Sequence, residues 1–319
     1  MLNILSVTFP FFALVLGGYL AVRIALLPMV TIPGLNAFVL YFALPCMLYR
    51  FGVSTPIAQL LDPGVFGVYL VCALIMVAFT VATTLSHRID WNNAAFGALT
   101  AAFPNTGFMG VPLLVALLGA RAAGPVIVTI VVDLIITSSL CIALSRLDGA
   151  GMHGARDAAG KALRGVAANP MPWAIMLGAT ASAFDLALPK PVMQTIVLLA
   201  DAASPVALFT IGAVLARSQM SSADPTPLID YVPIALKKLI LHPLLVFLMG
   251  RAAIRLGVPL DPFALTVIVL VAALPSASNV ALLAERFGAN NGRIARVILV
   301  STALAFLTFS GAVTLLVER

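Results

Sequence analysis

Two short polar runs, each beginning at a proline, lie in the middle of otherwise apolar stretches of this sequence. They carry amides and hydroxyls next to the prolines, at Pro104, Asn105, Thr106, Pro275, Ser276, Ser278 and Asn279. Proline removes a backbone hydrogen bond from a helix and clashes with the preceding turn, so each run predicts a broken helix. The half-helix after a break presents free N–H groups and a positive dipole end, which suits an anion. We therefore predict that these residues bind an anionic substrate; the alternative is a pair of simple proline kinks.

Two carboxylates also fall inside apolar stretches. Asp133 follows Ile-Val-Val, and Asp201 precedes Ser204 and Pro205. An acid within a membrane is a functional candidate because its burial there is costly. Either one is a candidate to carry a proton or Na⁺ coupled to transport. The alternatives are a polar contact between helices for Asp133, and for Asp201 a bond to backbone freed by Pro205 or a place near the membrane interface.

The cysteines and histidines give no sign of a metal or a cofactor. There is no CxxC pair and no closely spaced His/Cys cluster among Cys46, Cys72, Cys141, His87, His153 and His242. Zinc sites need such ligands brought together, often at short spacings. We predict that no cofactor or metal is bound. His242 is interpreted as a structural residue.

The composition identifies the elements that must position these residues. Of 319 residues, 62% are apolar and 9% are charged, against about 25% charged in soluble domains. This excludes a soluble enzyme, a disordered chain and a nucleic-acid binder, and predicts an all-α polytopic membrane protein in a lipid bilayer. A membrane helix takes about 20 residues. Ten apolar segments are predicted, at 3–22, 33–52, 64–86, 92–119, 124–145, 169–185, 191–216, 231–254, 262–285 and 294–316.

The Lys and Arg residues predict the orientation. If the N-terminus is outside, the loops on the inner side hold twelve of the 18 basic residues and the outer side holds six. Inner loops of membrane proteins are enriched in Lys and Arg, so both termini are predicted outside. The first segment is expected to be a retained helix, not a signal peptide. Lys237 and Lys238 are expected to extend toward the inner face.

The two halves of the chain share short patterns. Pro45 to Gly52 and Pro205 to Gly212 both read P-x-x-L-x-x-x-G, 160 residues apart, and the stretches ending at Pro104 and Pro275 match at a distance of 171. Five segments are an odd number, so the second half enters the membrane from the opposite side, which is a common plan in secondary transporters. We predict a first repeat over 1–145, a cytoplasmic linker over 146–168 and an inverted second repeat over 169–319.

The chain resembles the auxin efflux carrier family, in its prokaryotic branch, which includes bacterial malonate carriers. The resemblance spans nearly the whole chain. It is carried by Pro10, Gly18-Tyr19, the run from Leu35 to Pro45, Phe103-Pro-Asn-Thr-Gly107, Ala272-Ala-Leu-Pro275 and Ala284-Glu-Arg-Phe287. It implies ten helices in two inverted repeats, with broken helices 4 and 9 crossing at their prolines. It also implies elevator-like transport of an organic anion by a protein of the bacterial inner membrane.

The sequence departs from the plant members of that family. After Pro275 the chain reads Ser-Ala-Ser-Asn-Val280, where plant exporters have Gln-Gly-Ile-Val-Pro, and the long plant loop is absent. A small carboxylate such as malonate is therefore a better expectation than auxin. The resemblance thus favours a secondary active carrier of a small organic anion, driven by a proton or Na⁺. The oligomeric state, including a homodimer, stays open.

Two other classes of function remain as alternatives. A channel or sensor for organic anions is compatible with the composition, although broken helices in an inverted repeat favour alternating access. An intramembrane aspartyl protease is suggested only by the two acids, and neither has a Gly-x-Gly before it. There is also no Gly-x-Ser-x-Gly nucleophile motif. No phosphate-binding GxxxxGK[ST] loop is present, so ATP-driven pumping by this chain is not supported.

Overall fold

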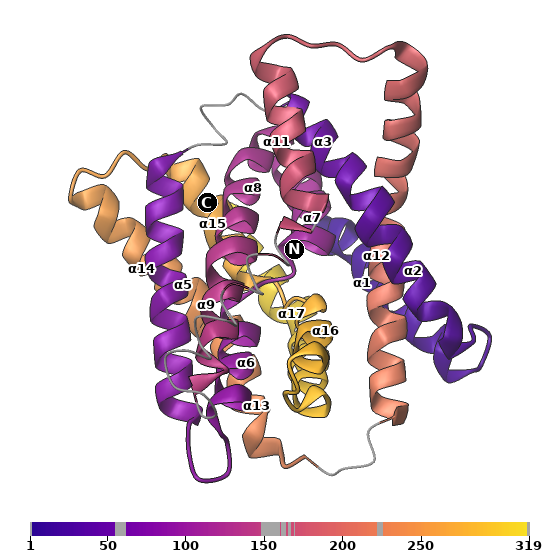
Figure 1. Cartoon of the computed structure of the whole chain (residues 1–319). Helices are drawn as coiled ribbons and strands as arrows, with labels where there is room; N and C mark the ends of the chain where they lie inside the picture. The colour runs from indigo at the N-terminus through magenta and orange to yellow at the C-terminus, as the bar shows by residue number, and fades with distance from the viewer. Residues whose placement is uncertain are drawn as a thin grey trace.

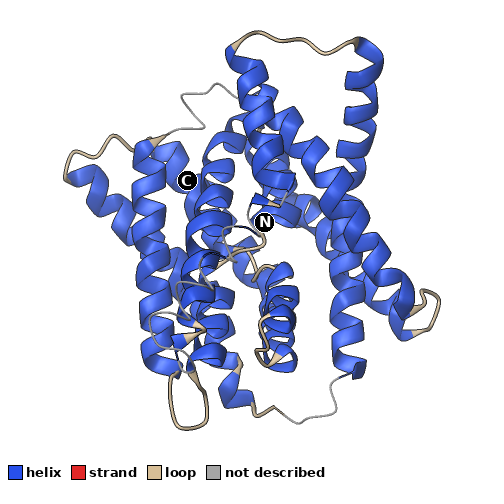
Figure 2. Cartoon of the chain, viewed as in Figure 1, coloured by secondary structure: helices blue, strands red, loops and turns tan. Residues whose placement is uncertain are grey.

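The chain folds as a bundle of helices in a computed structural model that describes residues 2–54, 62–147, 160, 164, 167–168, 170–221 and 226–317. The described residues contain no β-strand, and Figure 2 shows helices joined by short loops. Two isolated β-bridges occur, Ser86 with Ile89 and Pro104 with Ser276. The predicted all-α class is therefore confirmed. The linker predicted at 146–168 lies largely outside the described residues.

Helix is found in every apolar segment expected from the sequence. In the first half the helices are α1 Leu2–Arg23, α2 Ile32–Phe38, α3 Leu44–Ser54, α5 Pro63–Thr84, α6 Trp91–Ala102, α7 Val111–Leu118, α8 Ala123–Val131 and α9 Ser138–Leu144. In the second half they are α11 Pro170–Ala183, α12 Lys190–Ser221, α13 Val232–Leu236, α14 His242–Arg255, α15 Pro262–Ala273, α16 Asn279–Arg286 and α17 Asn291–Val317.

Some helices are joined without a break by π-helical turns, so that two labels form one continuous rod. These turns are η2 Val39–Ala43, η5 Val132–Thr137 and η7 Lys237–Leu241, while a fourth π-helical turn, η3 Thr106–Gly110, begins the rod that α7 continues. Six stretches of the described residues are long and apolar enough to cross a membrane: Met29–Ser54, Pro63–Thr84, Ala120–Leu144, Lys190–Arg217, Leu228–Arg255 and Asn291–Val317. Phe9–Arg23, Thr106–Leu118 and Pro262–Ala273 are apolar but shorter. Several apolar helices of this kind fit an integral multi-pass membrane protein.

The helices α6 and α15 correspond in length and in the way they begin. Each has 12 residues, and the second starts 171 residues after the first. Each is preceded by an aspartate whose side chain caps it: Asp90 accepts from the N–H of Asn93 at 2.8 Å, and Asp261 accepts from that of Phe263 at 3.2 Å. Such caps satisfy N–H groups that have no partner inside the helix. The two helices therefore start alike and, as described below, end alike.

The helices pack as two groups. Segments 1, 2, 6 and 7, which are α1, α2, α3, α11 and α12, pack mainly against one another. We call them the four-segment group, and they lie on the right in Figure 1. The other helices form the six-segment group, in which α5 packs on α6 and α14 on α15. The groups meet where α1 and α12 contact α17, and where α12 contacts η3.

Glycines allow the backbones of the four-segment group to touch. α1 and α12 cross at Gly18 and Gly212, and a Cβ added at either glycine would collide with backbone of the facing helix. α3 and α11 cross at Gly52 and Gly178, where an added Cβ on Gly178 would lie 2.5 Å from the Tyr49 carbonyl oxygen. Small residues permit such close helix crossings in membranes. Gly178 follows Gly18 by 160 residues, and Gly212 follows Gly52 by 160.

Candidate functional site

The helices α6 and α15 both end at the residue before a proline. Phe103 (φ −99°, ψ 101°) precedes Pro104, and Leu274 (φ −64°, ψ 156°) precedes Pro275, so both are extended. The proline ring disfavours helical geometry in the preceding residue, which explains why each helix stops there. The chain then re-enters a helix, at η3 after the first break and at α16 after the second. The predicted breaks at Pro104 and Pro275 are therefore present.

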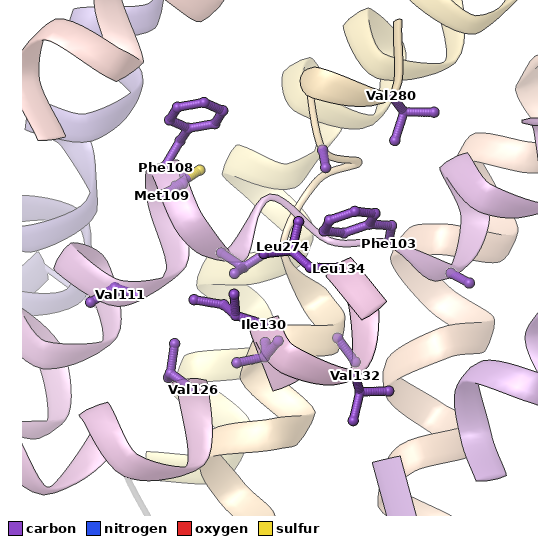
Figure 3. Close-up of a cluster of buried hydrophobic side chains, with 14 of the residues drawn as sticks. Phe103, Phe108, Met109, Val111, Val126, Ile130, Val132, Leu134, Leu274 and Val280 are labelled. Carbon is purple, nitrogen blue, oxygen red and sulfur yellow. The ribbon is translucent and has the colours of Figure 1, made fainter. Parts of the chain in front are cut away.

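The two breaks cross and are joined by backbone hydrogen bonds. The N–H of Asn105 donates to the Pro275 carbonyl at 2.8 Å, and the N–H of Ala277 donates to the Phe103 carbonyl at 2.9 Å. Figure 3 shows the crossing chains with Phe103, Leu134 and Leu274 packed around them. These bonds satisfy groups that the broken helices leave free, as a buried backbone requires. The site thus rests on a short antiparallel pairing between segments far apart in sequence.

A small cavity of about 20 Å³ lies at this crossing. Residues of both breaks line it, together with Ile130 and Leu134 of segment 5. Leu44 and Met171 of the four-segment group close its other side. A single water molecule needs about 10–15 Å³ of such space, so the cavity is far too small for an organic anion in this arrangement. It lies between the two helix groups.

Polar side chains at the crossing are buried, and some of them lack partners. Asn105 is 3% exposed, and Thr106 and Ser276 are fully buried. Ser278 and Asn279 are half-buried. The Ser276 hydroxyl and the Asn279 side-chain oxygen have no hydrogen-bond partner. Because a buried polar group without a partner costs free energy, these atoms are available to a ligand or to water. All seven residues singled out from the sequence lie in or beside the crossing.

Among the residues that the structure describes, no Lys or Arg lines the cavity, and its lining is mostly apolar. The polar groups beside it are the Asn105 and Asn279 amides, the Thr106 hydroxyl and the backbone at the starts of η3 and α16. Helix starts of this kind favour negative charge through N–H groups and the helix dipole. The arrangement suits an anion bound by amides and backbone.

A second polar cluster is buried behind the crossing, and Asp133 is part of it. Asp133 is fully buried in the π-helical turn η5. Its two oxygens accept hydrogen bonds from the Tyr69 hydroxyl at 2.9 Å and from the Thr137 hydroxyl at 3.2 Å. π-helical turns are often found at functional sites. Asp133 is thus a buried acid, as expected from the sequence, and both of its carboxylate oxygens accept hydrogen bonds.

Lys238 is a buried residue of this cluster that was not recognised from the sequence. It was expected to extend toward the membrane surface, but it is fully buried in the π-helical turn η7. Its ammonium group donates to the Ala272 carbonyl at 2.5 Å and lies 3.2 Å from Nδ1 of His242. The ring of His242 lies 6.0 Å from the ring of Tyr69, which bonds Asp133, so Lys238 belongs to the same buried cluster. The signal available was the i, i+4 spacing of Lys238 and His242, which places both on one helix face.

Asp201 does not share this environment. Its side chain is 62% exposed, and it forms an ion pair of 2.6 Å with Arg50. The sequence suggested a lone acid inside the membrane, whereas the structure places Asp201 on the α12 surface beside a cation of α3. It is not brought together with Asp133 or with the crossing. Among the described residues, no group of three or more His, Cys, Asp or Glu is placed to hold a metal ion.

Comparison with known proteins assigns the chain to a family. The family described as "Membrane transport protein" matches residues 4–313. The chain is 30% identical over 321 residues to the "Putative malonate transporter" of Rhizobium meliloti (strain 1021), covering 99% of this chain and 97% of that protein. It is 29% identical to the "Uncharacterized transporter YfdV" of Escherichia coli (strain K12), covering 61% of this chain and 59% of that one.

A plant protein is also similar, over a shorter stretch. The "Auxin efflux carrier component 4" of Arabidopsis thaliana is 30% identical over 125 residues, which is 37% of this chain and 19% of that protein. The family and these relatives are transporters, not enzymes. Together with the long apolar helices, the near-complete match shows that this chain belongs to the membrane transport protein family, the family of the auxin efflux carriers.

Proposed function

We propose that this chain is a secondary carrier of a small dicarboxylate such as malonate, which binds at the crossing of the two broken helices. The observation that carries the proposal is the pairing of the two breaks beside a small cavity, with the unpartnered Asn279 oxygen in its lining and the unpartnered Ser276 hydroxyl buried in the second break. A full-length relative bears the name of a malonate transporter. The amides and helix starts at the cavity suit carboxylates.

Ten membrane crossings in two inverted repeats are part of the proposal. Two independent sets of correspondences support it. The helices α6 and α15 match in length, in their Asp caps and in their terminal prolines at a spacing of 171 residues. The two glycine crossings of the four-segment group match at a spacing of 160. If the two halves are repeats, α1 corresponds to α11 and α3 corresponds to α12. The α1–α12 crossing then corresponds to the α11–α3 crossing.

We further propose that transport is a movement of the six-segment group against the four-segment group. The cavity is closed on one side by the crossing and on the other by Leu44 and Met171 of the four-segment group. Relative motion of the groups would open it, because its walls belong to both. The backbone contact at the glycine crossings keeps the four-segment group tight, which favours rigid-body motion. Alternating access by such motion around a fixed site is common in carriers built from repeats.

A proton coupled through Asp133 is the proposed driving ion. Both Asp133 oxygens already accept hydrogen bonds, and the Lys238 ammonium lies in the same buried cluster. A second cation such as Na⁺ would be repelled by that ammonium and would have to displace the donors. A proton needs neither space nor a new set of ligands. Lys238 also bonds the carbonyl of Ala272, two residues before the second break, so the cluster is tied to the site.

The test is malonate binding by variants of the crossing. Asn105→Ala and Asn279→Ala each remove one amide from the cavity. Each should weaken malonate binding about tenfold, because losing one hydrogen bond to a charged ligand costs ~1.4 kcal/mol or more. Binding is read from the thermal stabilisation of purified protein across a malonate titration, and transport from uptake of labelled malonate into proteoliposomes.

Asn36→Ala is the matched control for these variants. Asn36 lies in α2 and does not line the cavity, so its variant should bind malonate like the unmutated protein. If malonate stabilises the protein but both crossing variants bind it unchanged, the site is elsewhere. If neither malonate nor other small dicarboxylates stabilise the unmutated protein, the proposed substrate class is wrong.

A further inference from the structure

Two loops of the four-segment group present apolar side chains to the outside of the molecule. The first, residues 24–31, joins α1 to α2, and the second, residues 184–189, joins α11 to α12. Both loops hold large apolar side chains that are more than half exposed: Ile24, Leu26 and Val30 in the first, and Phe184 and Leu186 in the second. We call them the apolar loops. Their exposed side chains pack on no other part of the chain, which calls for a partner outside it.

The apolar loops begin in the same way. Just after α1 comes Ala25 with φ 59°, and just after α11 comes Asp185 with φ 49°, exactly 160 residues later. Many helices end at such a left-handed residue, and the apolar residue that follows it commonly packs back on the last turn. Here the following residues are Leu26, which is 76% exposed, and Leu186, which is 59% exposed. Both leucines therefore point away from the helix that they follow.

The apolar loops lie at opposite ends of α12, as Figure 1 shows. The second loop leads directly into Lys190, where α12 begins. The first loop follows α1, whose Tyr19 hydroxyl donates to the Gln219 side chain near the end of α12. Lys190 and Gln219 are 29 residues apart in one helix, which is about 44 Å along its axis. A bilayer is about 40–45 Å thick with its headgroups and about 30 Å thick without them.

We infer that the apolar loops are interfacial anchors, which insert at the boundary between lipid headgroups and acyl chains, one loop in each leaflet. The length of α12 places both loops at the depth of the headgroups. In water the exposed apolar side chains would stay hydrated, whereas in the hydrocarbon core the irregular backbone of a loop would lack hydrogen-bond partners. The boundary avoids both costs, since it accepts apolar side chains and still supplies water to the backbone.

The charges beside the apolar loops fit the same partner. The first loop contains no charged residue and follows Arg23, while the second contains Asp185 and precedes Lys190. Arg23 and Lys190 are both exposed. Basic side chains next to buried apolar ones can reach lipid phosphates. The inference does not depend on the transported substrate. If the helix groups move as proposed, the anchors would hold the four-segment group at a constant depth.

The experiment measures the depth of each loop in phosphatidylcholine bilayers. Leu26→Cys and Leu186→Cys, in the full chain without native cysteines, carry an environment-sensitive fluorophore. Its emission should shift to the blue, and nitroxides near the lipid headgroup should quench it more than nitroxides near the end of the acyl chain. His87→Cys is the matched control, since His87 is exposed in the tight turn between α5 and α6. Its label should emit as in water, with little quenching by either nitroxide.

Val30→Cys and Phe184→Cys repeat the measurement at a second position of each loop, so that the result does not depend on one label. Quenching no stronger than at His87 would place the loops in water and overturn the inference. Stronger quenching by the deep nitroxides would place them in the hydrocarbon core, and shallow quenching of one loop alone would remove the second anchor; either result overturns it. A blue-shifted label that lipid does not quench, and that reverts when the protein is diluted in lipid, would show that a second copy covers the loop, which also overturns it.

Discussion

At the scale of single residues, Asp133 and Lys238 are two ionisable residues that are fully buried in one polar cluster without a direct ion pair between them. If the two charges compensate each other there, removing one of them should cost about 3 kcal/mol or more, as in other buried charge pairs. Lys238→Met should therefore lower the unfolding temperature of the purified protein strongly. Asp133→Asn combined with Lys238→Met leaves neither charge, so the double variant should recover much of the loss.

The thermal unfolding of the two single variants and the double variant, compared as a cycle, measures this coupling. The exposed pair of Arg121 and Asp261, which lies near the starts of two helices, provides the reference cycle, since surface ion pairs contribute only about 0–1 kcal/mol. Additive effects of Asp133→Asn and Lys238→Met would show that the two charges do not depend on one another.

The coupling role proposed for Asp133 gives a separate prediction. Asp133→Asn keeps the shape of the side chain but removes the group that would carry the proton. The variant should still exchange malonate across the membrane, while an imposed proton gradient should no longer accelerate its uptake. Asp201→Asn, which alters an exposed acid, should respond to the gradient like the unmutated protein. Gradient-driven uptake by Asp133→Asn would remove Asp133 from the coupling path.

The parts of the candidate site that depend only on residues close together in the sequence were predictable. Pro104 and Pro275 could be recognised from the sequence because each is followed within four residues by amides and hydroxyls, whereas Pro10 and Pro205 lie inside continuous helices. The burial of Lys238 depends on which helices pack around segment 8, and the adjacent Lys237 has the same residue type. The exposure of Asp201 depends in the same way on the neighbouring α3. Residue type alone therefore could not separate the buried Lys238 from its neighbour.

At the scale of elements, the glycine crossings decide how the four-segment group is held together. Gly212→Leu would place a side chain where the backbone of α1 now lies, at Val15 and Tyr19. Overpacking of this kind typically costs about 1–3 kcal/mol, and here backbone would have to move. The variant should unfold at lower temperature than Gly311→Leu, its control in α17, because an added Cβ at Gly311 meets nothing within 4 Å. Equal stability of the two variants would contradict the close crossing.

The positions of the helices along the chain could be predicted from the sequence, but which helices pack against one another could not. The apolar segments predicted the helices to within a few residues, apart from α12, which continues five residues past the predicted end to Ser221. In a soluble protein, hydrophobic periodicity shows which face of a helix is buried. Inside a membrane, the faces that contact lipid and the faces that contact other helices are both apolar, so periodicity does not identify the partners of a helix. The grouping of segments 1, 2, 6 and 7 arises from backbone contacts between glycines of distant segments, which no local pattern encodes.

At the scale of the whole molecule, the division into two helix groups predicts which cross-links stop transport. Leu44→Cys in α3 and Gly107→Cys at the first break both line the small cavity, from opposite groups. A cysteine is tolerated at Gly107, since an added Cβ there meets nothing within 4 Å. In a background without the native cysteines, a short bifunctional thiol reagent should join the two groups and abolish malonate uptake.

Ile130→Cys with Gly107→Cys is the matched pair within the six-segment group, because Ile130 lines the same cavity from α8. Cross-linking this pair should leave uptake largely intact if the group moves as one body. Equal inhibition by both cross-links would argue that the helices rearrange individually.

The cavity at the crossing also limits how fast any solute could pass through this protein. A space of about 20 Å³ holds about one water molecule, so an organic anion does not fit at the crossing in this arrangement of the helices. Under the proposed mechanism, each anion waits for the walls to separate and close again, and such collective motions take microseconds to milliseconds. With millisecond motions, the flux through one molecule would then be limited to about a thousand solutes per second.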